Sequence, residues 1–127
     1  MKPKTKLEIL QETAEFYAAD PKRRALLYPN CPDDRTCAYI TSDGRMCAVG
    51  RCLKAPDADF NGTANMLNEQ RGGPEGLQGL LKAEYVGHAL PFWYALQEFH
   101  DTRENWTDTG LSETGTAHLE RLKKDFA

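Results

Sequence analysis

Among the residues of this sequence that could do chemistry, the four cysteines come first, because a thiolate can bind a metal ion or act as a nucleophile. The chain places five, nine and four residues between them. Structural zinc sites usually take their thiolates in close pairs, about two to four residues apart, because one tight turn presents both sulfurs to the ion. No two of these cysteines form such a pair, so we interpret them as small buried hydrophobic residues and keep zinc as an alternative. The four are Cys31, Cys37, Cys47 and Cys52.

A second set of possible metal ligands follows the cysteines. Asp57, Asp59 and Asn61-Gly62 repeat the first half of an EF-hand loop, including the glycine at its sharp turn. Such a loop ends in a bidentate glutamate, and the corresponding position here is Asn68. A turn rich in Asp and Asn explains the same residues without a cation. We therefore predict no metal site and keep calcium as an alternative.

The residue types for a cysteine-dependent enzyme are also present. A nucleophilic thiol needs a base within hydrogen-bonding reach and a third group that orients the base. Cys47, His100 and Asp101 are the candidates. Neighbouring side chains on a helix point about 100° apart, which predicts that Asp101 orients His100 poorly. We predict no catalytic residues, and such an enzyme stays an alternative.

Arginines beside aromatic side chains suit two kinds of binding. They can hold a phosphate or stack on a base, and Arg, Tyr and Trp are enriched at protein interfaces. We predict a protein partner, with a small-molecule or nucleotide ligand as the alternative. The predicted binding residues are surface positions near a central hairpin and an aromatic helix: Arg45, Arg51, Trp93, Tyr94, His100, Asp101 and Trp106.

The composition narrows the choice of partners. The 127 residues carry a net charge of −3, whereas a dedicated nucleic-acid binder is usually basic, so no nucleic-acid partner is expected. No apolar run approaches the roughly 20 residues that a membrane helix needs. The N-terminal stretch also lacks the apolar core of a secretory signal. We expect a cytoplasmic protein with reduced cysteines, no membrane association and no cofactor.

The predicted centre of the fold is a β-hairpin. Alternating residues over 37–42 and 45–50 flank Asp43-Gly44, which suits a tight two-residue turn. In that register Ile40 pairs with Cys47. A three-residue loop with a bulge is the alternative, and it would change which side chains share a face.

The first helix has the clearest local signals. Thr5 and Glu8 have the spacing of a capping box, which predicts a helix over 6–19. Leu7 begins the row of apolar residues that recur at helical spacing along it, with Leu10, Ala14 and Tyr17 following.

Further helices are expected on both sides of the hairpin. A two-stranded ribbon is marginal alone and must pack on them. We predict an α+β fold in which one small antiparallel β-hairpin packs between five or six α-helices, as a single domain over 1–127. The remaining helices are expected at 21–27, 63–70, 74–83, 91–104 and after Ser112, with loops at 29–34, 55–62 and 105–110.

Three short motifs recur together in one type of protein. They are Cys37-x-Tyr39, then Gly44-x-x-Cys47-Ala48-Val49-Gly50-Arg51-Cys52-Leu53, then Leu96-Gln97-x-x-His100-Asp101. With Asp20-Pro21-Lys22-Arg23-Arg24-Ala25 before the hairpin, the chain resembles small uncharacterised proteins of bacteriophages and prophages. The resemblance implies a phage or prophage setting, in which accessory proteins often bind a host factor or a signalling molecule. It implies no activity and no catalytic residues.

Overall fold

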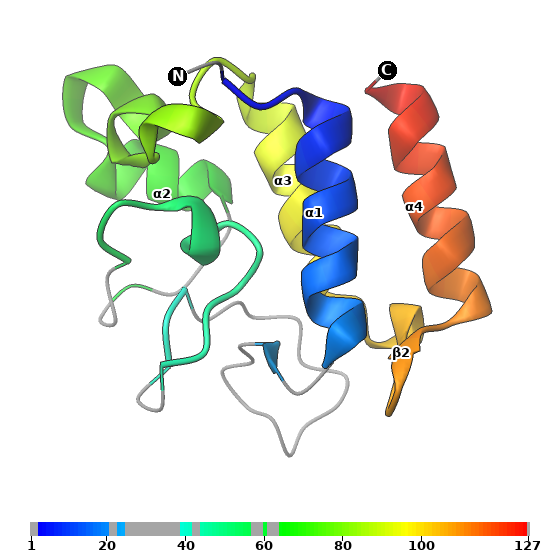
Figure 1. Ribbon diagram of the computed structural model, residues 1–127. Coiled ribbons are helices and arrows are strands. Elements are labelled where there is room, and N and C mark those ends of the chain that lie inside the picture. The colour runs from blue at the N-terminus through cyan, green and yellow to red at the C-terminus, as the bar shows by residue number, and fades with distance from the viewer. Residues whose placement is uncertain are drawn as a thin grey trace.

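The computed structural model describes residues 3–20, 23–24, 39–41, 44–56, 60 and 64–126 (Figure 1). Within these residues, helices of two kinds pack with one short antiparallel sheet, so the predicted α+β class with a small hairpin and several helices is confirmed. The α-helices are α1 (Lys6–Ala19), α2 (Ala64–Arg71), α3 (Leu90–Asp101) and α4 (Glu113–Asp125). The 3-10 helices are η2 (Gly50–Cys52), η3 (Gly73–Leu80), η4 (Ala83–Tyr85) and η5 (Arg103–Asn105), and the strands are β1 (Trp106–Thr107) and β2 (Gly110–Leu111).

Helix α1 begins and ends where the sequence predicts. The Thr5 side chain accepts a hydrogen bond from the Glu8 amide, and the Glu8 carboxylate accepts one from the Thr5 amide. Both bonds satisfy amides that have no partner inside the helix. The residues that α1 buries are Ile9, Leu10, Thr13, Ala14 and Tyr17.

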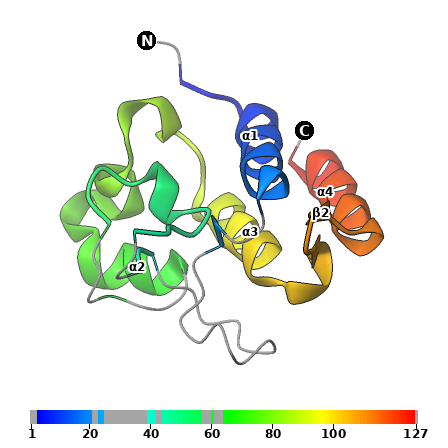
Figure 2. The ribbon, with the colours of Figure 1, turned by 60° about the horizontal axis from the view of Figure 1, so that its bottom comes forward.

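Helix α3 is the centre of the molecule. Figure 2 shows it between α2 and η3 on one side and α1 with α4 on the other. It is buried on more than one face, which explains its aromatic composition. The helix ends at Asp101, three residues earlier than predicted, and the chain continues into η5. Its buried residues are Phe92, Trp93, Leu96, Gln97, Phe99, His100 and Asp101.

The predicted hairpin over 37–50 is reduced to one bridge. Ile40 pairs with Met46, not with Cys47, and the Thr41 amide donates to the Arg45 carbonyl at 2.8 Å. Gly44 has a φ of 86°, as the bulged three-residue loop requires. The alternative register is therefore the observed one. Residues 37, 38, 42 and 43 lie outside the described part of the chain.

The prediction of a second strand over 45–50 is wrong, because the chain turns away from the first strand after Met46. Residues 48–49 form a turn that continues into η2. Gly50 lies so close to Tyr39 that a Cβ added to it would be 2.1 Å from the Tyr39 carbonyl oxygen. The small residues at 47–50 therefore allow a turn to pack closely, and they do not pair as a β-strand.

The paired strands of the structure, β1 and β2, form a hairpin at 106–111, where a loop was predicted over 105–110. Trp106 pairs with Leu111 and Thr107 with Gly110. The Trp106 ring is buried against Tyr17 and Phe99, with centroid distances of 6.0 and 5.4 Å. This long-range contact, which local sequence does not show, holds the strand in place.

The remaining predictions have mixed outcomes. The helix at 63–70 is confirmed as α2 and the helix after Ser112 as α4, where the Ser112 hydroxyl accepts from the Gly115 amide at 2.9 Å. In place of the helix predicted at 74–83 lies the 3-10 helix η3, which ends at Leu80 and is interrupted at Gly76, where φ is 64°. Of the predicted helix at 21–27, only residues 23 and 24 are described. None of the described helices is both long and apolar enough to span a membrane.

The close approach of Gly50 to Tyr39 gives a test of this packing. Gly50→Ala forces a methyl group against a backbone oxygen and should lower the free energy of unfolding by about 1–3 kcal/mol. Urea denaturation measures the change. Gly79→Ala is the control, since the nearest atom to its added Cβ would be a carboxylate oxygen of the flexible Glu75 side chain, at 3.1 Å. Equal stability of the two variants would contradict the proposed packing.

Candidate functional site

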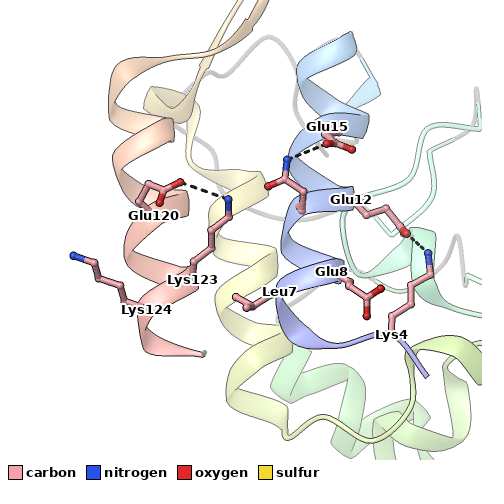
Figure 3. Close-up of a pocket in the computed structure, with 9 residues that line it drawn as sticks. Lys4, Leu7, Glu8, Glu12, Glu15, Glu120, Lys123 and Lys124 are labelled. Carbon is pink, nitrogen blue, oxygen red and sulfur yellow. Dashed lines mark hydrogen bonds and ion pairs between the residues drawn. The ribbon is translucent and has the colours of Figure 1, made fainter. Parts of the chain in front are cut away.

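A groove of about 750 Å³ separates α1 from α4 (Figure 3). The two helices run in opposite directions, so the first turn of α1 lies beside the last turn of α4 (Figure 1). Leu7 lies between them with 43% of its surface exposed. The residues that line the groove are Lys4, Leu7, Glu8, Gln11, Glu12, Glu15, Glu120, Lys123 and Lys124.

The groove stays open because of what faces it. Each helix buries its apolar residues on its other side, as Leu10 does on α1 and Leu119 and Leu122 do on α4. The facing positions carry long charged side chains, which are almost never fully buried unless they are paired. Their aliphatic stems together with Leu7 give the groove an apolar floor beneath charged rims.

Charge is distributed unevenly along the groove. Lys124 lies toward one end, beside the first turn of α1, and Glu15 lies toward the other, with Lys123 and Glu120 paired between them (Figure 3). Lys123 is 3.5 Å from Glu120 in an exposed pair, which adds little stability and can be exchanged for another partner. In the described part of the chain, Lys124 has no ion pair, and Glu15 accepts a hydrogen bond from the neutral Gln11 at 2.9 Å.

A tight polar cluster forms one rim of the groove. The Glu12 carboxylate accepts hydrogen bonds from Lys4 and Tyr85 and lies 2.7 Å from Nη1 of Arg51. Partial burial alone would raise the pKa of Glu12, but the hydrogen bonds from Lys4, Tyr85 and Arg51 lower it to about 2. Burial and the bond to Glu12 raise the pKa of the Tyr85 hydroxyl. The cluster joins the N-terminal segment, α1, η2 and η4.

Most of the sequence-predicted binding residues are core residues. The side chains of Trp93 and His100 are fully buried, and Asp101 and Trp106 are nearly so, which contradicts their prediction as surface residues. The Trp106 indole donates to the His100 carbonyl at 3.1 Å, so this part of the predicted site stabilises the end of α3. The prediction failed because the local sequence around an aromatic residue does not show whether a distant helix will cover its side chain.

The other three predicted binding residues differ from one another in exposure and in contacts. Tyr94 is 41% exposed. Arg45 is half-buried, and its Nη1 lies 3.5 Å from the Arg24 carbonyl oxygen. Arg51 belongs to the cluster around Glu12. The structure therefore does not bring the seven residues together into one surface.

His100 and Asp101 interact, against the expectation from helix geometry. Nδ1 of His100 lies 2.6 Å from Oδ1 of Asp101. Asp101 is the last residue of α3, where the chain leaves the helix, so its side chain can turn back toward its neighbour.

Cys47, the third residue of the candidate enzyme site, does not take part in this interaction. Its sulfur accepts a hydrogen bond from the Gly50 amide at 3.2 Å, and its side chain is fully buried.

The metal-site candidates fall largely outside the described residues. Cys31, Cys37 and the calcium-like segment 57–62 are not described, except for Phe60. Within the described ranges, no group of three or more His, Cys, Asp or Glu side chains is placed to hold a metal ion. Cys52 is fully buried, and burial raises the pKa of its thiol to about 12.

Sequence reasoning missed the groove because it assigned Leu7 to the buried face of α1. The buried row instead begins at Ile9, and Leu7 is flanked by Glu8, Gln11 and Glu15 on the exposed side. A leucine surrounded by acidic residues at helical spacing was the available signal. Comparison of the chain with protein-family models, curated proteins and solved structures found no match.

The pairing of Glu12 predicts how stability depends on pH. Its pKa is about 2 in the folded protein and 4.5 when unperturbed, so its contribution is present above about pH 4.5 and is lost as the pH falls toward 2. Glu12→Gln should lose less stability across that window than the natural chain in urea denaturation. Glu120→Gln, which removes an exposed carboxylate from α4, is the control. Parallel acid profiles for the natural chain and Glu12→Gln would refute this role.

The buried thiols predict strong protection from alkylation. Iodoacetamide reacts with exposed thiolates, so Cys47 and Cys52 should remain unmodified in the native protein and react after unfolding in urea. Mass spectrometry of the peptides that contain each residue separates them from the other cysteines, and a free thiol in the same solution calibrates the rate. Rapid alkylation of native Cys47 would favour the cysteine-dependent enzyme instead.

Proposed function

We propose that this protein acts by binding another protein, and that the partner places an amphipathic helix in the groove between α1 and α4. The observation that carries the proposal is the groove itself, in which an exposed leucine lies between charged rims. Helix-in-groove recognition uses an apolar anchor in such a depression, with polar residues around it.

The charges of the groove specify the partner. Glu15 toward one end favours basic residues, and Lys124 toward the other favours acidic ones. Glu15 lies eight residues from Leu7, or about 12 Å along the helix axis. The matching helix therefore has an apolar residue opposite Leu7, acidic residues near it on one side, and basic residues about two turns away.

The setting of this interaction follows from the sequence motifs. Their resemblance to phage and prophage proteins supports an accessory protein whose partner is a host or phage protein. The two buried free thiols, Cys47 and Cys52, support a reducing compartment, and we place the proposed activity in the cytoplasm.

A synthetic helix tests the groove directly. A side-chain-stapled peptide of about four turns would carry leucine at its centre, glutamates toward one end and lysines toward the other. Fluorescence anisotropy should show saturable binding to the natural protein. Leu7→Lys should weaken it about tenfold or more, because it places a charge at the centre of the contact. Met66→Lys is the matched control, since Met66 on α2 is 40% exposed.

Exchange of charges tests the orientation. Glu15→Lys should weaken the peptide about two- to fivefold, as expected for an exposed ion pair. A second peptide with glutamate in place of its lysines should recover that loss with the variant and not with the natural chain. Failure of every peptide to bind, or equal effects of Leu7→Lys and Met66→Lys, would refute the groove as the binding site.

A further inference from the structure

Arg51 uses only one part of its guanidinium group. Its Nη1 is 2.7 Å from Oε1 of Glu12 and 3.4 Å from the Tyr85 hydroxyl. Its Nε and Nη2 are buried and have no hydrogen-bond acceptor among the residues that the structure describes. These two nitrogens form the outer edge of the planar group, which points its N–H donors in parallel.

An unpaired charged edge is unusual inside a protein. Arginine stays protonated, and burying its donors without acceptors costs free energy, so such groups normally have partners. The Nε–Nη2 edge has the geometry that holds two oxygens of a carboxylate or a phosphate through parallel hydrogen bonds. Lysine has no equivalent edge.

The surroundings of Arg51 are cationic and aromatic. Its guanidinium carbon lies 5.3 Å from the centroid of the Phe16 ring, and that of Arg23 lies 4.7 Å from the same ring. With Lys4, these arginines give three positive charges, against the carboxylates of Glu12 and Glu84 that act on Lys4. The excess of positive charge favours an anionic ligand.

The Phe16 side of Arg51 is more exposed than the Tyr85 side. Two aromatic rings lie against Arg51, and the Tyr85 ring is buried whereas Phe16 is half-buried and Arg23 is exposed. Rotation of the Phe16 side chain toward solvent is therefore the motion that would admit a small ligand. Glu12 stays bound to Nη1 and need not be displaced.

We propose that the Nε–Nη2 edge of Arg51 is a binding site for a small oxyanion, a carboxylate or a phosphate group held by two parallel hydrogen bonds beside Phe16. This site is separate from the α1–α4 groove, whose lining does not include Arg51. It also gives the sequence-predicted Arg51 a binding role of its own.

Arginine-selective nuclear magnetic resonance can observe the Nε–H group directly. Titration of the whole protein with inorganic phosphate, and separately with acetate, should shift the Arg51 Nε–H signal saturably, while sodium chloride at the same ionic strength should not. A response to phosphate alone identifies a phosphate site, and a response to acetate alone identifies a carboxylate site. The Arg121 signal, from an exposed residue on α4, is the internal control.

Thermal denaturation gives a second readout. The effective anion should raise the melting temperature of the natural chain and of Arg121→Lys, but not that of Arg51→Lys, which keeps the charge and loses the edge. An Arg51 signal that responds to no anion, or responds equally to chloride, would overturn the proposal. The groove peptides should still bind Arg51→Lys, so the two proposals fail independently.

Discussion

The fold depends on a helix end that is buried. Helix α3 ends at His100 and Asp101, which are buried, so carbonyl groups at this end have little access to water and need donors within the protein. Each of the last four carbonyl groups has a donor, either Arg24 from an earlier part of the chain or a residue in the segment that follows the helix. Glu98 accepts from Thr102, Phe99 from Asn105, His100 from Arg24 and Trp106, and Asp101 from Arg24, at distances of 2.7–3.3 Å.

This constraint explains features that otherwise look unrelated. Arg24 is 8% exposed and lies against the Trp106 ring at 5.6 Å, because its positive charge complements the negative end of the α3 dipole. Burial lowers the pKa of the Arg24 guanidinium and the nearby Asp101 carboxylate opposes that change. The hairpin at 106–111 forms because Trp106 must reach His100. The buried indole of Trp106 thus explains why a segment with a turn-forming sequence contains two short strands.

The sequence predicted well wherever the deciding interaction was local. The bounds of α1 followed from a capping box of adjacent residues, and the start of α4 followed from Ser112. Predictions failed where a distant residue decided the outcome. Gly50 turns the chain because it meets Tyr39, and His100 is buried because Tyr17 packs edge-on against it at 4.8 Å. The candidate groove was missed for the same reason, since the exposure of Leu7 depends on where α4 lies.

Glu12 links the two candidate binding places. Its carboxylate lines the groove and also holds Nη1 of Arg51, so one side chain contributes to both. A partner helix that offered a cation to Glu12 would compete with Arg51 for the same oxygens, and this would change the charge that an oxyanion meets. Coupling of this kind is reciprocal, because each ligand changes the affinity of the other by the same factor.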